Sequence, residues 1–203
     1  MNELLKNGYL IIPNTLNKYN FDLCYNAIQN NTVNYTVVKS IIDNNIINKL
    51  EVKLNWDKPV YIKYRVSNNN NSIDASLFHR DIIPLNHYDT NDMIFTCLLY
   101  LDEGYMELIP NSHKNNRNQN LNAKKILKLN KNDILIFYSS TIHRGIFYNT
   151  STNRKLIQIF ELFPNKETYH KLNNKIYHII NYKEKSNKVI QSFVINLSKI
   201  KVI

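Results

Sequence analysis

Short segments rich in Val, Ile, Phe, Tyr and Thr follow one another from about residue 59 to residue 162. Clusters of turn-forming residues separate these segments, as is typical of strands in antiparallel sheets. The expected strands cover residues 60–66, 75–79, 93–101, 105–109, 126–129, 133–138, 141–147 and 154–163. About eight strands in one block predict a mainly β (α+β) fold, a double-stranded β-helix of the jelly-roll, cupin-like type.

Two stretches before this block carry apolar residues at helical spacing. One helix is expected to begin at Asn14, as its cap, and to end near residue 29; the other is expected over residues 36–50. The positions expected to face the core are Leu16, Tyr19, Leu23 and Ala27 in the first helix and Val38, Ile41, Ile42, Ile46 and Leu50 in the second. We expect both helices to pack on one sheet of the jelly roll.

The pattern indicates a single domain without internal repeats. It consists of a helical part at residues 1–55, a jelly-roll core at residues 59–163 and a basic C-terminal extension at residues 165–203, whose spacing fits either helix or strand. Two asparagine-rich stretches, residues 67–72 and 111–122, are expected to form mobile loops. They serve either as surface filler or as a lid over a site.

Composition excludes several classes of protein. The chain has 203 residues, of which 43% are hydrophobic, enough for a proper core and too many for a disordered chain. No apolar run approaches the roughly 18 residues of a membrane span, and the first residues are unlike a secretory signal peptide. Cys24 and Cys97 lie far apart in apolar surroundings, so we expect free thiols in a reducing, cytoplasmic compartment.

The charge is strongly positive, since 26 Lys and Arg against 16 Asp and Glu give a formal net charge of +10. Such a charge is compatible with a nucleic-acid partner. However, Asn makes up about one residue in six, and Asn, Ile, Lys and Tyr all have AT-rich codons. An AT-rich genome would supply lysines without selection for binding, so the sequence allows a nucleic-acid partner but does not favour one.

The first chemical motif is His79-Arg80-Asp81. Residues i and i+2 of a strand point to the same face, so an imidazole and a carboxylate could face into a barrel together. The alternative is an exposed turn. A second strand–turn–strand segment carries His143, 62 residues after Asp81. Two histidines and one aspartate are the ligand set of a facial triad for non-haem Fe(II), which leaves three positions open on the metal.

Three further residues are candidates for binding. Arg154 follows His143 by 11 residues and begins an alternating strand, where an inward guanidinium would need an anion such as the distal carboxylate of a dicarboxylate. Thr96 lies on a strand that could face the same cosubstrate and assist Arg154, although core packing fits it equally well. Arg65 lies on the strand before the His79 motif and could hold a substrate acid group or a surface carboxylate.

The segment that begins at His79 also fits the protein-kinase catalytic loop H-R-D-x-x-x-x-N. A kinase would need a glycine-rich loop upstream and a D-F-G motif downstream. The sequence has neither, and it is short for two kinase lobes. The kinase interpretation is therefore rejected.

The order of these motifs resembles the Fe(II)/2-oxoglutarate oxygenases, and within them the phytanoyl-CoA dioxygenase-like family. Gly8–Pro13 is similar to that family's N-terminal "G-y-v-v-i-p" segment. Leu101–Gly104 with Glu107–Lys114 is similar to its "N-G-x-l-x-v-i-P-G-S-H-k" stretch, and His143–Gly145 to its "H-x-g/s" after a "G-D-l-l-i-F" strand. The resemblance covers about residues 5–163. It departs from the family where Asn111 and Asn132 replace glycines.

The resemblance implies a hydroxylating dioxygenase that uses Fe(II), 2-oxoglutarate and O2 and releases succinate and CO2. His79, Asp81 and His143 would hold the metal, Arg154 the far carboxylate of 2-oxoglutarate, and the substrate would be a small or lipid-like molecule. His113 matches a family position and is expected to brace a loop. The alternatives are a non-catalytic jelly-roll binding protein and an oxygenase that acts on nucleic acid or protein.

Overall fold

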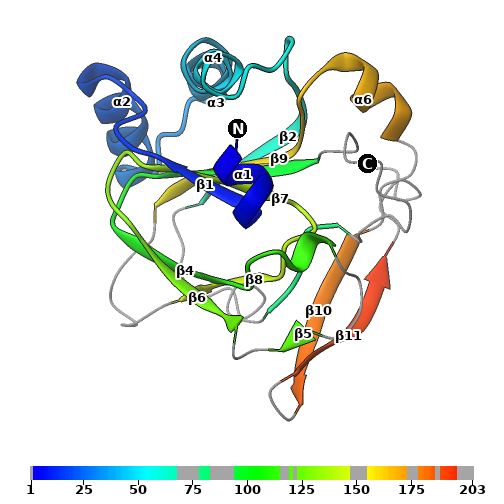
Figure 1. The fold of residues 1–203 in the computed structure, drawn as a ribbon. Helices are drawn as coiled ribbons and strands as arrows, with labels where there is room; N and C mark the ends of the chain where they lie inside the picture. The colour runs from blue at the N-terminus through cyan, green and yellow to red at the C-terminus, as the bar shows by residue number, and fades with distance from the viewer. Residues whose placement is uncertain are drawn as a thin grey trace.

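The computed structural model describes residues 2–67, 78–82, 94–114, 119–120, 123–146, 155–172, 178–185 and 188–195. Its centre is a five-stranded antiparallel sheet (Figure 1). In spatial order, the strands are β1 (Tyr9–Ile12), β7 (Ile134–Tyr138), β3 (Phe95–Tyr100), β9 (Leu156–Phe163) and β2 (Val60–Ser67). Together with the smaller sheet described next, this sheet confirms the predicted jelly-roll architecture and most of its predicted strands.

A second, three-stranded sheet lies across one face of the first (Figure 1). It contains β6 (Lys125–Leu129), β4 (Gly104–Leu108) and β8 (His143–Ile146). A third sheet follows from the C-terminal part of the chain and contains β10 (His178–Lys185), β11 (Lys188–Ile195) and β5 (Gln119–Asn120). The extension at residues 165–203 thus contributes strands as well as a helix, α6 (Lys166–Leu172).

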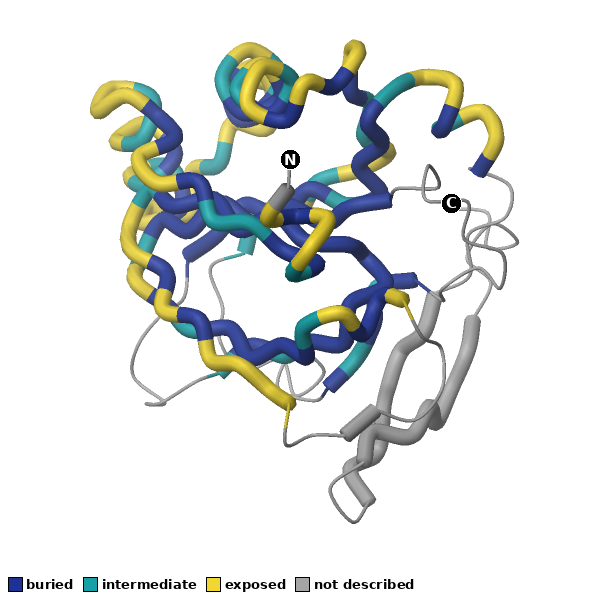
Figure 2. The backbone as a smooth tube through the Cα atoms, viewed as in Figure 1, coloured by how far each residue is buried: buried dark blue, intermediate teal, exposed yellow. Residues whose placement is uncertain are grey.

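Helices cover the opposite face of the five-stranded sheet (Figures 1 and 2). They are α1 (Asn2–Asn7), α2 (Lys18–Gln29), α3 (Tyr35–Ile41) and α4 (Asn48–Leu54), and a π-helical segment, Ile42–Ile47, joins α3 to α4. Val38, Ile41, Ile42, Ile46 and Leu50 are all buried against the sheet, as predicted. In Figure 2, the helices turn their exposed sides outward and their buried sides to the sheet.

The start of the first long helix was predicted wrongly. Asn17 caps α2 by accepting a hydrogen bond from the Asn20 N–H, whereas Asn14 takes a left-handed backbone conformation with φ 49°. The predicted apolar face was only partly right. Leu16 is buried just before α2, but Tyr19 is 71% exposed and Leu23 is exposed as well, and the side chains buried in α2 are Cys24 and Ile28.

Side chains of β3 alternate between the two faces of the five-stranded sheet. Phe95, Cys97 and Leu99 belong to the core beneath the helices. Leu98 and Tyr100 belong to a second core that fills the space between the two sheets. Thr96 lies on the same inner face as Leu98 and Tyr100. A polar side chain is therefore directed into the space between the two sheets, where a site can form.

Cys24 and Cys97 are free and buried, and burial raises the pKa of both thiols, that of Cys24 to about 11. Within the described ranges, no helix has the length and apolar character needed to cross a membrane. Most of the two asparagine-rich stretches, and residues 75–77 of one expected strand, lie outside the described residues.

Candidate metal centre

Two of the predicted ligands, His79 and His143, pair with each other through their backbones. His143 begins β8, and His79 pairs with it in an isolated antiparallel bridge in which each residue donates its N–H to the carbonyl of the other, both at 2.9 Å. Because they occupy directly opposite positions, the two side chains lie on the same face. Their ring centroids are 4.3 Å apart.

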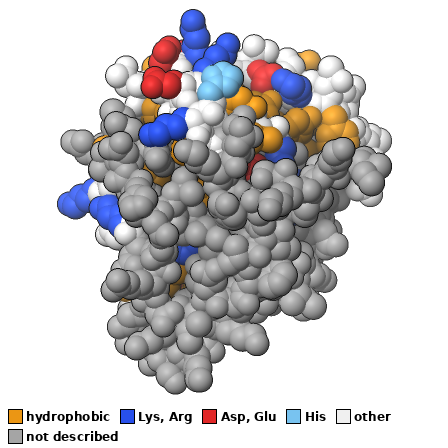
Figure 3. Space-filling model, turned by 90° about the vertical axis from the view of Figure 1, so that its right-hand side faces the viewer, with side chains coloured by type: hydrophobic (Ala, Val, Ile, Leu, Met, Phe, Trp, Pro, Cys, Tyr) orange, Lys and Arg blue, Asp and Glu red, His pale blue; other side chains and the backbone are white. Residues whose placement is uncertain are grey.

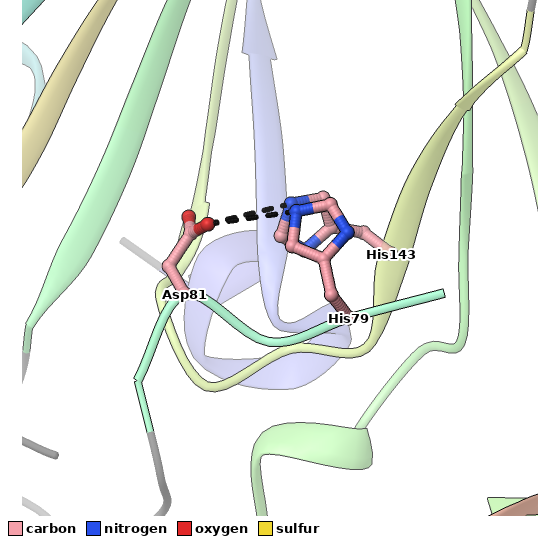
Figure 4. A group of neighbouring side chains, drawn as sticks. All are labelled: His79, Asp81 and His143. Carbon is pink, nitrogen blue, oxygen red and sulfur yellow. Dashed lines mark ion pairs between the residues drawn. The ribbon is translucent and has the colours of Figure 1, made fainter. Parts of the chain in front are cut away.

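Asp81 reaches the same place from the end of β7, an interior strand of the five-stranded sheet. Its N–H, together with that of Ile82, donates to the carbonyl of Ser139, the residue that follows β7. The carboxylate then points back at both imidazoles (Figure 4). Its Oδ1 lies 3.7 Å from Nε2 of His79 and 3.8 Å from Nε2 of His143.

The donor set suits a divalent transition metal. One ligand atom from each of His79, Asp81 and His143 lies within 4.8 Å of the others. Nδ1 of His143 is 2.9 Å from the carbonyl of Thr141. A carbonyl only accepts hydrogen bonds, so Nδ1 carries the proton and Nε2 presents its lone pair to the centre of the cluster. Two imidazoles and one carboxylate match the ligand types of non-haem Fe(II) sites.

The arginine between the ligands is buried, so the exposed-turn alternative was wrong. Arg80 has no exposed surface and donates from Nη1 to the carbonyl of Ser112 at 2.7 Å and to that of Ser140. These carbonyls belong to the loops that follow β4 and β7. The guanidinium therefore joins both loops behind the metal site, while the residues on either side of it face the site.

Thr96 contacts a candidate metal ligand directly. Its hydroxyl donates to Oδ2 of Asp81 at 2.5 Å and lies 2.9 Å from the hydroxyl of Ser139. The sequence suggested a contact with Arg154 and a cosubstrate. Arg154 lies outside the described residues, and the contacts of Thr96 within them go to Asp81 and Ser139.

Arg65 lies on β2, on the face opposite the helices. Its neighbours Tyr64 and Val66 pack into the core beneath the helices, so Arg65 faces the other way. Its guanidinium donates to Oε1 of Gln158 at 2.7 Å and lies over the ring of Phe160. Lys63 lies over the same ring and is half exposed. Two cations thus lie side by side on the inner face of the edge strand.

A buried carboxylate that was not predicted from the sequence lies near the site. Glu161 is only 3% exposed and has a left-handed backbone with φ 45°, next to an irregularity in the pairing of β3 with β9. The pKa of Glu161 is raised above its ordinary value. Burial is the largest cause, the nearby charge of Asp81 acts in the same direction, and Lys63 at 3.5 Å opposes both. A lone acidic residue within the apolar run of residues 156–163 was the signal for it.

His113 braces the site from outside. Its ring stacks on that of Tyr138 with centroids 4.2 Å apart, and a Cβ added to Gly8 would lie 2.5 Å from its Nδ1. Gly8 has φ +83°, so this position requires glycine for two reasons. Burial, together with smaller contributions from the positive charges of Lys114 and Arg80, lowers the pKa of His113 to about 4. The motifs around Gly8 and His113 are therefore in contact.

No family model matches this chain, and no curated protein matches it at a significant level. Solved structures do match. The non-heme alpha-ketoglutarate-dependent epimerase SnoN from nogalamycin biosynthesis has a TM-score of 0.57 and 13% identity, over 79% of this chain and 80% of that one. The carbocyclase SnoK from the same biosynthesis has a TM-score of 0.56 and 13% identity, over 96% and 94%.

HygX from Streptomyces hygroscopicus, solved with nickel, 2-oxoglutarate and hygromycin B bound, has a TM-score of 0.56 and 11% identity. That match covers 81% of this chain and 86% of HygX. These structural neighbours are Fe/2-oxoglutarate-dependent enzymes or carry 2-oxoglutarate and a metal. At such low identity they establish a shared fold.

Proposed function

We propose that this protein is a non-haem Fe(II)- and 2-oxoglutarate-dependent dioxygenase that hydroxylates a small molecule. The observation that carries the proposal is the convergence of His79, Asp81 and His143 between the two sheets, with ligand atoms within 4.8 Å of one another. The shared fold of SnoN, SnoK and HygX supports it. Within that superfamily, the motifs around Gly8, His113 and His143 favour a phytanoyl-CoA dioxygenase-like enzyme.

Each residue has a separate task in this proposal. His79, Asp81 and His143 hold the metal, and the Thr141 carbonyl keeps His143 in the tautomer that can bind it. Arg154 holds the far carboxylate of 2-oxoglutarate through two parallel hydrogen bonds. The iron with 2-oxoglutarate and O2 supplies the oxidising power. The apolar core between the sheets excludes water from one side of the site.

Arg65, with Lys63 beside it, favours a substrate with an acidic group, and Lys63 also pairs with the buried Glu161 at 3.5 Å. Both cations lie over the ring of Phe160, and Gln158 positions the guanidinium. Gln158 pairs with Leu98, a residue of the inner core, so these side chains share the sheet face that carries Thr96. An anionic group held there would leave the rest of the substrate to extend toward the metal.

Two alternatives differ in what they predict. A non-catalytic jelly-roll protein would bind a ligand without turnover. An oxygenase acting on nucleic acid would need a continuous basic surface. Among the side chains that Figure 3 colours on one face, Lys and Arg lie near acidic and apolar ones. Retention of DNA or RNA that falls steeply with salt concentration would favour the nucleic-acid alternative.

The decisive experiment measures 2-oxoglutarate binding by calorimetry with and without Mn(II), followed by succinate release with Fe(II) and O2. We expect 2-oxoglutarate to bind only when metal is present. His79→Ala should abolish metal binding, whereas Arg154→Ala should weaken 2-oxoglutarate binding and leave the metal affinity unchanged. Equal 2-oxoglutarate binding with and without metal, or none at all, would overturn the proposal. Binding without succinate release would identify the non-catalytic alternative.

A further inference from the structure

We propose that Thr96 and Ser139 are positioning residues that restrict Asp81 to a single metal-binding oxygen. This inference rests on the proposed metal site and deepens it. The two oxygens of the Asp81 carboxylate have different surroundings. Oδ1 faces both imidazoles, at 3.7 and 3.8 Å from their Nε2 atoms, whereas Oδ2 accepts a hydrogen bond of 2.5 Å from the Thr96 hydroxyl.

The direction of the hydrogen bonds follows from the groups involved. An ionised carboxylate only accepts, so the single hydroxyl proton of Thr96 goes to Asp81. The contact of 2.9 Å between the Thr96 and Ser139 hydroxyls must then be a bond that Ser139 donates. The chain runs from Ser139 to Thr96 to Oδ2, and a hydroxyl that accepts one bond donates the next more strongly.

Ser139 holds the same ligand a second time through its backbone. Its carbonyl accepts the N–H of Asp81 at 2.9 Å and that of Ile82 at 3.1 Å. Thr96 and Ser139 have no exposed surface, so water does not compete for these bonds. Thr96 lies on β3 and Ser139 directly after β7, both strands of the five-stranded sheet, whereas His143 begins β8 of the smaller sheet and His79 pairs with it. Thr96 and Ser139 therefore fix the one ligand that bridges the two sheets.

The consequence concerns the number of open metal positions. A facial set of two histidines and one carboxylate oxygen leaves three of six positions for other ligands. A carboxylate that turned to bind through both oxygens would occupy one of them. A bidentate cosubstrate and O2 together require all three. By holding Oδ2, Thr96 keeps the third position available.

The test compares Thr96→Val, Thr96→Ser and Ser139→Ala with the wild type, and Thr15→Val serves as the matched control. Thr15 is also buried, and its hydroxyl donates to the Ile12 carbonyl, beside the end of β7 that lies away from the site. The probe is Mn(II), with affinity measured by calorimetry and bound water counted by water-proton relaxation.

We expect Thr96→Val to lower Mn(II) affinity by about 10–100-fold, the usual cost of losing an outer-shell partner of a metal ligand. It should also reduce the number of bound waters by one. Thr96→Ser should restore both values, Ser139→Ala should lower the affinity by a smaller factor, and Thr15→Val should change neither. If Thr96→Val does not fold, the comparison of Ser139→Ala with Thr96→Ser decides.

Unchanged affinity and hydration in a folded Thr96→Val protein would overturn the assignment and leave the proposed metal site intact. Unchanged values in Ser139→Ala would overturn the role of Ser139. A wild-type protein that binds no Mn(II) would overturn the proposed function as well, so the two failures are distinguishable.

Discussion

The space between the two sheets is apolar at one end and polar at the other. At one end it is filled by a core that includes Leu98, Tyr100, Leu129 and Leu135, each with at most 2% of its surface exposed. The other end lies where Ser139 follows β7. It is lined by the polar side chains of Thr96, Ser139, Asp81 and the two histidines. The rings of Phe137 and His143, 4.5 Å apart, mark the boundary.

The comparison shows how one jelly roll separates stability from chemistry. The apolar end buries hydrocarbon, which contributes on the order of 25 cal/mol for each Å² removed from water. The polar end buries a carboxylate and two imidazoles, which is unfavourable unless each polar atom has a partner. The Thr141 carbonyl at Nδ1 of His143 and the Thr96 hydroxyl at Oδ2 of Asp81 supply such partners. Substitutions at the two ends should therefore have different consequences.

The largest expected effect is on metal binding at the polar end. Asp81→Ala removes the only charged ligand of the triad, and metal affinity should fall by more than about 100-fold, beyond the 10–100-fold typical of outer-shell changes. Calorimetry with Mn(II) measures this loss. Thermal unfolding of the metal-free protein should change little, because the substitution also removes a partly buried carboxylate. Retained affinity would show that Asp81 is not a ligand.

The reverse result is expected at the apolar end. Leu135 is fully buried on β7, and Leu135→Ala should lower the free energy of unfolding by about 2–5 kcal/mol because it leaves a cavity. Metal affinity for each folded molecule should stay within about threefold of the wild type, since Leu135 lies four residues before Ser139. Denaturant unfolding measures the first quantity and calorimetry the second. A large loss of metal affinity in folded protein would contradict the separation of the two ends.

Most of the strands were predictable because they depend on a local pattern, the alternation of apolar residues. The triad was predictable from its ligand types, from the i and i+2 spacing of His79 and Asp81, and from the resemblance that pointed to His143. The cap of α2 was not predictable in the same way. Asn14 and Asn17 are both good caps by residue type, and only the left-handed backbone of Asn14 in the fold separates them.

Contacts between distant segments were beyond the sequence. The burial of Arg80 depends on two loops that meet over it. Arginine is mostly exposed in proteins, so the residue type alone predicts a surface position. The bond from Thr96 to Asp81 depends on how β3 is placed beside the His79 motif, which sequence spacing does not determine. Glu161 likewise depends on an irregular strand pairing that alternation does not predict.

A smaller, combined effect is expected at Arg80, which supports the polar end from behind. Arg80→Met fills much of the same volume but leaves the carbonyls of Ser112 and Ser140 without this donor. The free energy of unfolding should fall by about 2–4 kcal/mol, since each buried group left without a partner costs about 1–3 kcal/mol. Metal affinity should fall too, because Arg80 lies between two ligands. A change in stability without any change in affinity would restrict Arg80 to a structural role.

The smallest expected effect is a dependence of stability on pH that comes from His113, behind Tyr138 at the polar end. The pKa of His113 is lowered to about 4 in the folded protein, mainly by burial, so the unfolded chain takes up its proton first as the pH falls. The stabilisation is present above the ordinary histidine pKa of about 6.5 and declines between there and about pH 4, by about 2 kcal/mol.

His113→Asn removes the titrating ring and its stacking on Tyr138. Urea unfolding of both proteins at pH 7, 5.5 and 4 isolates the contribution, because the other titrating groups are common to both. The wild type should lose more stability than the variant over this range. Parallel losses would mean that His113 is protonated equally in the folded and unfolded chain. The polar end would then be less shielded from water than its contacts with Gly8 and Tyr138 indicate.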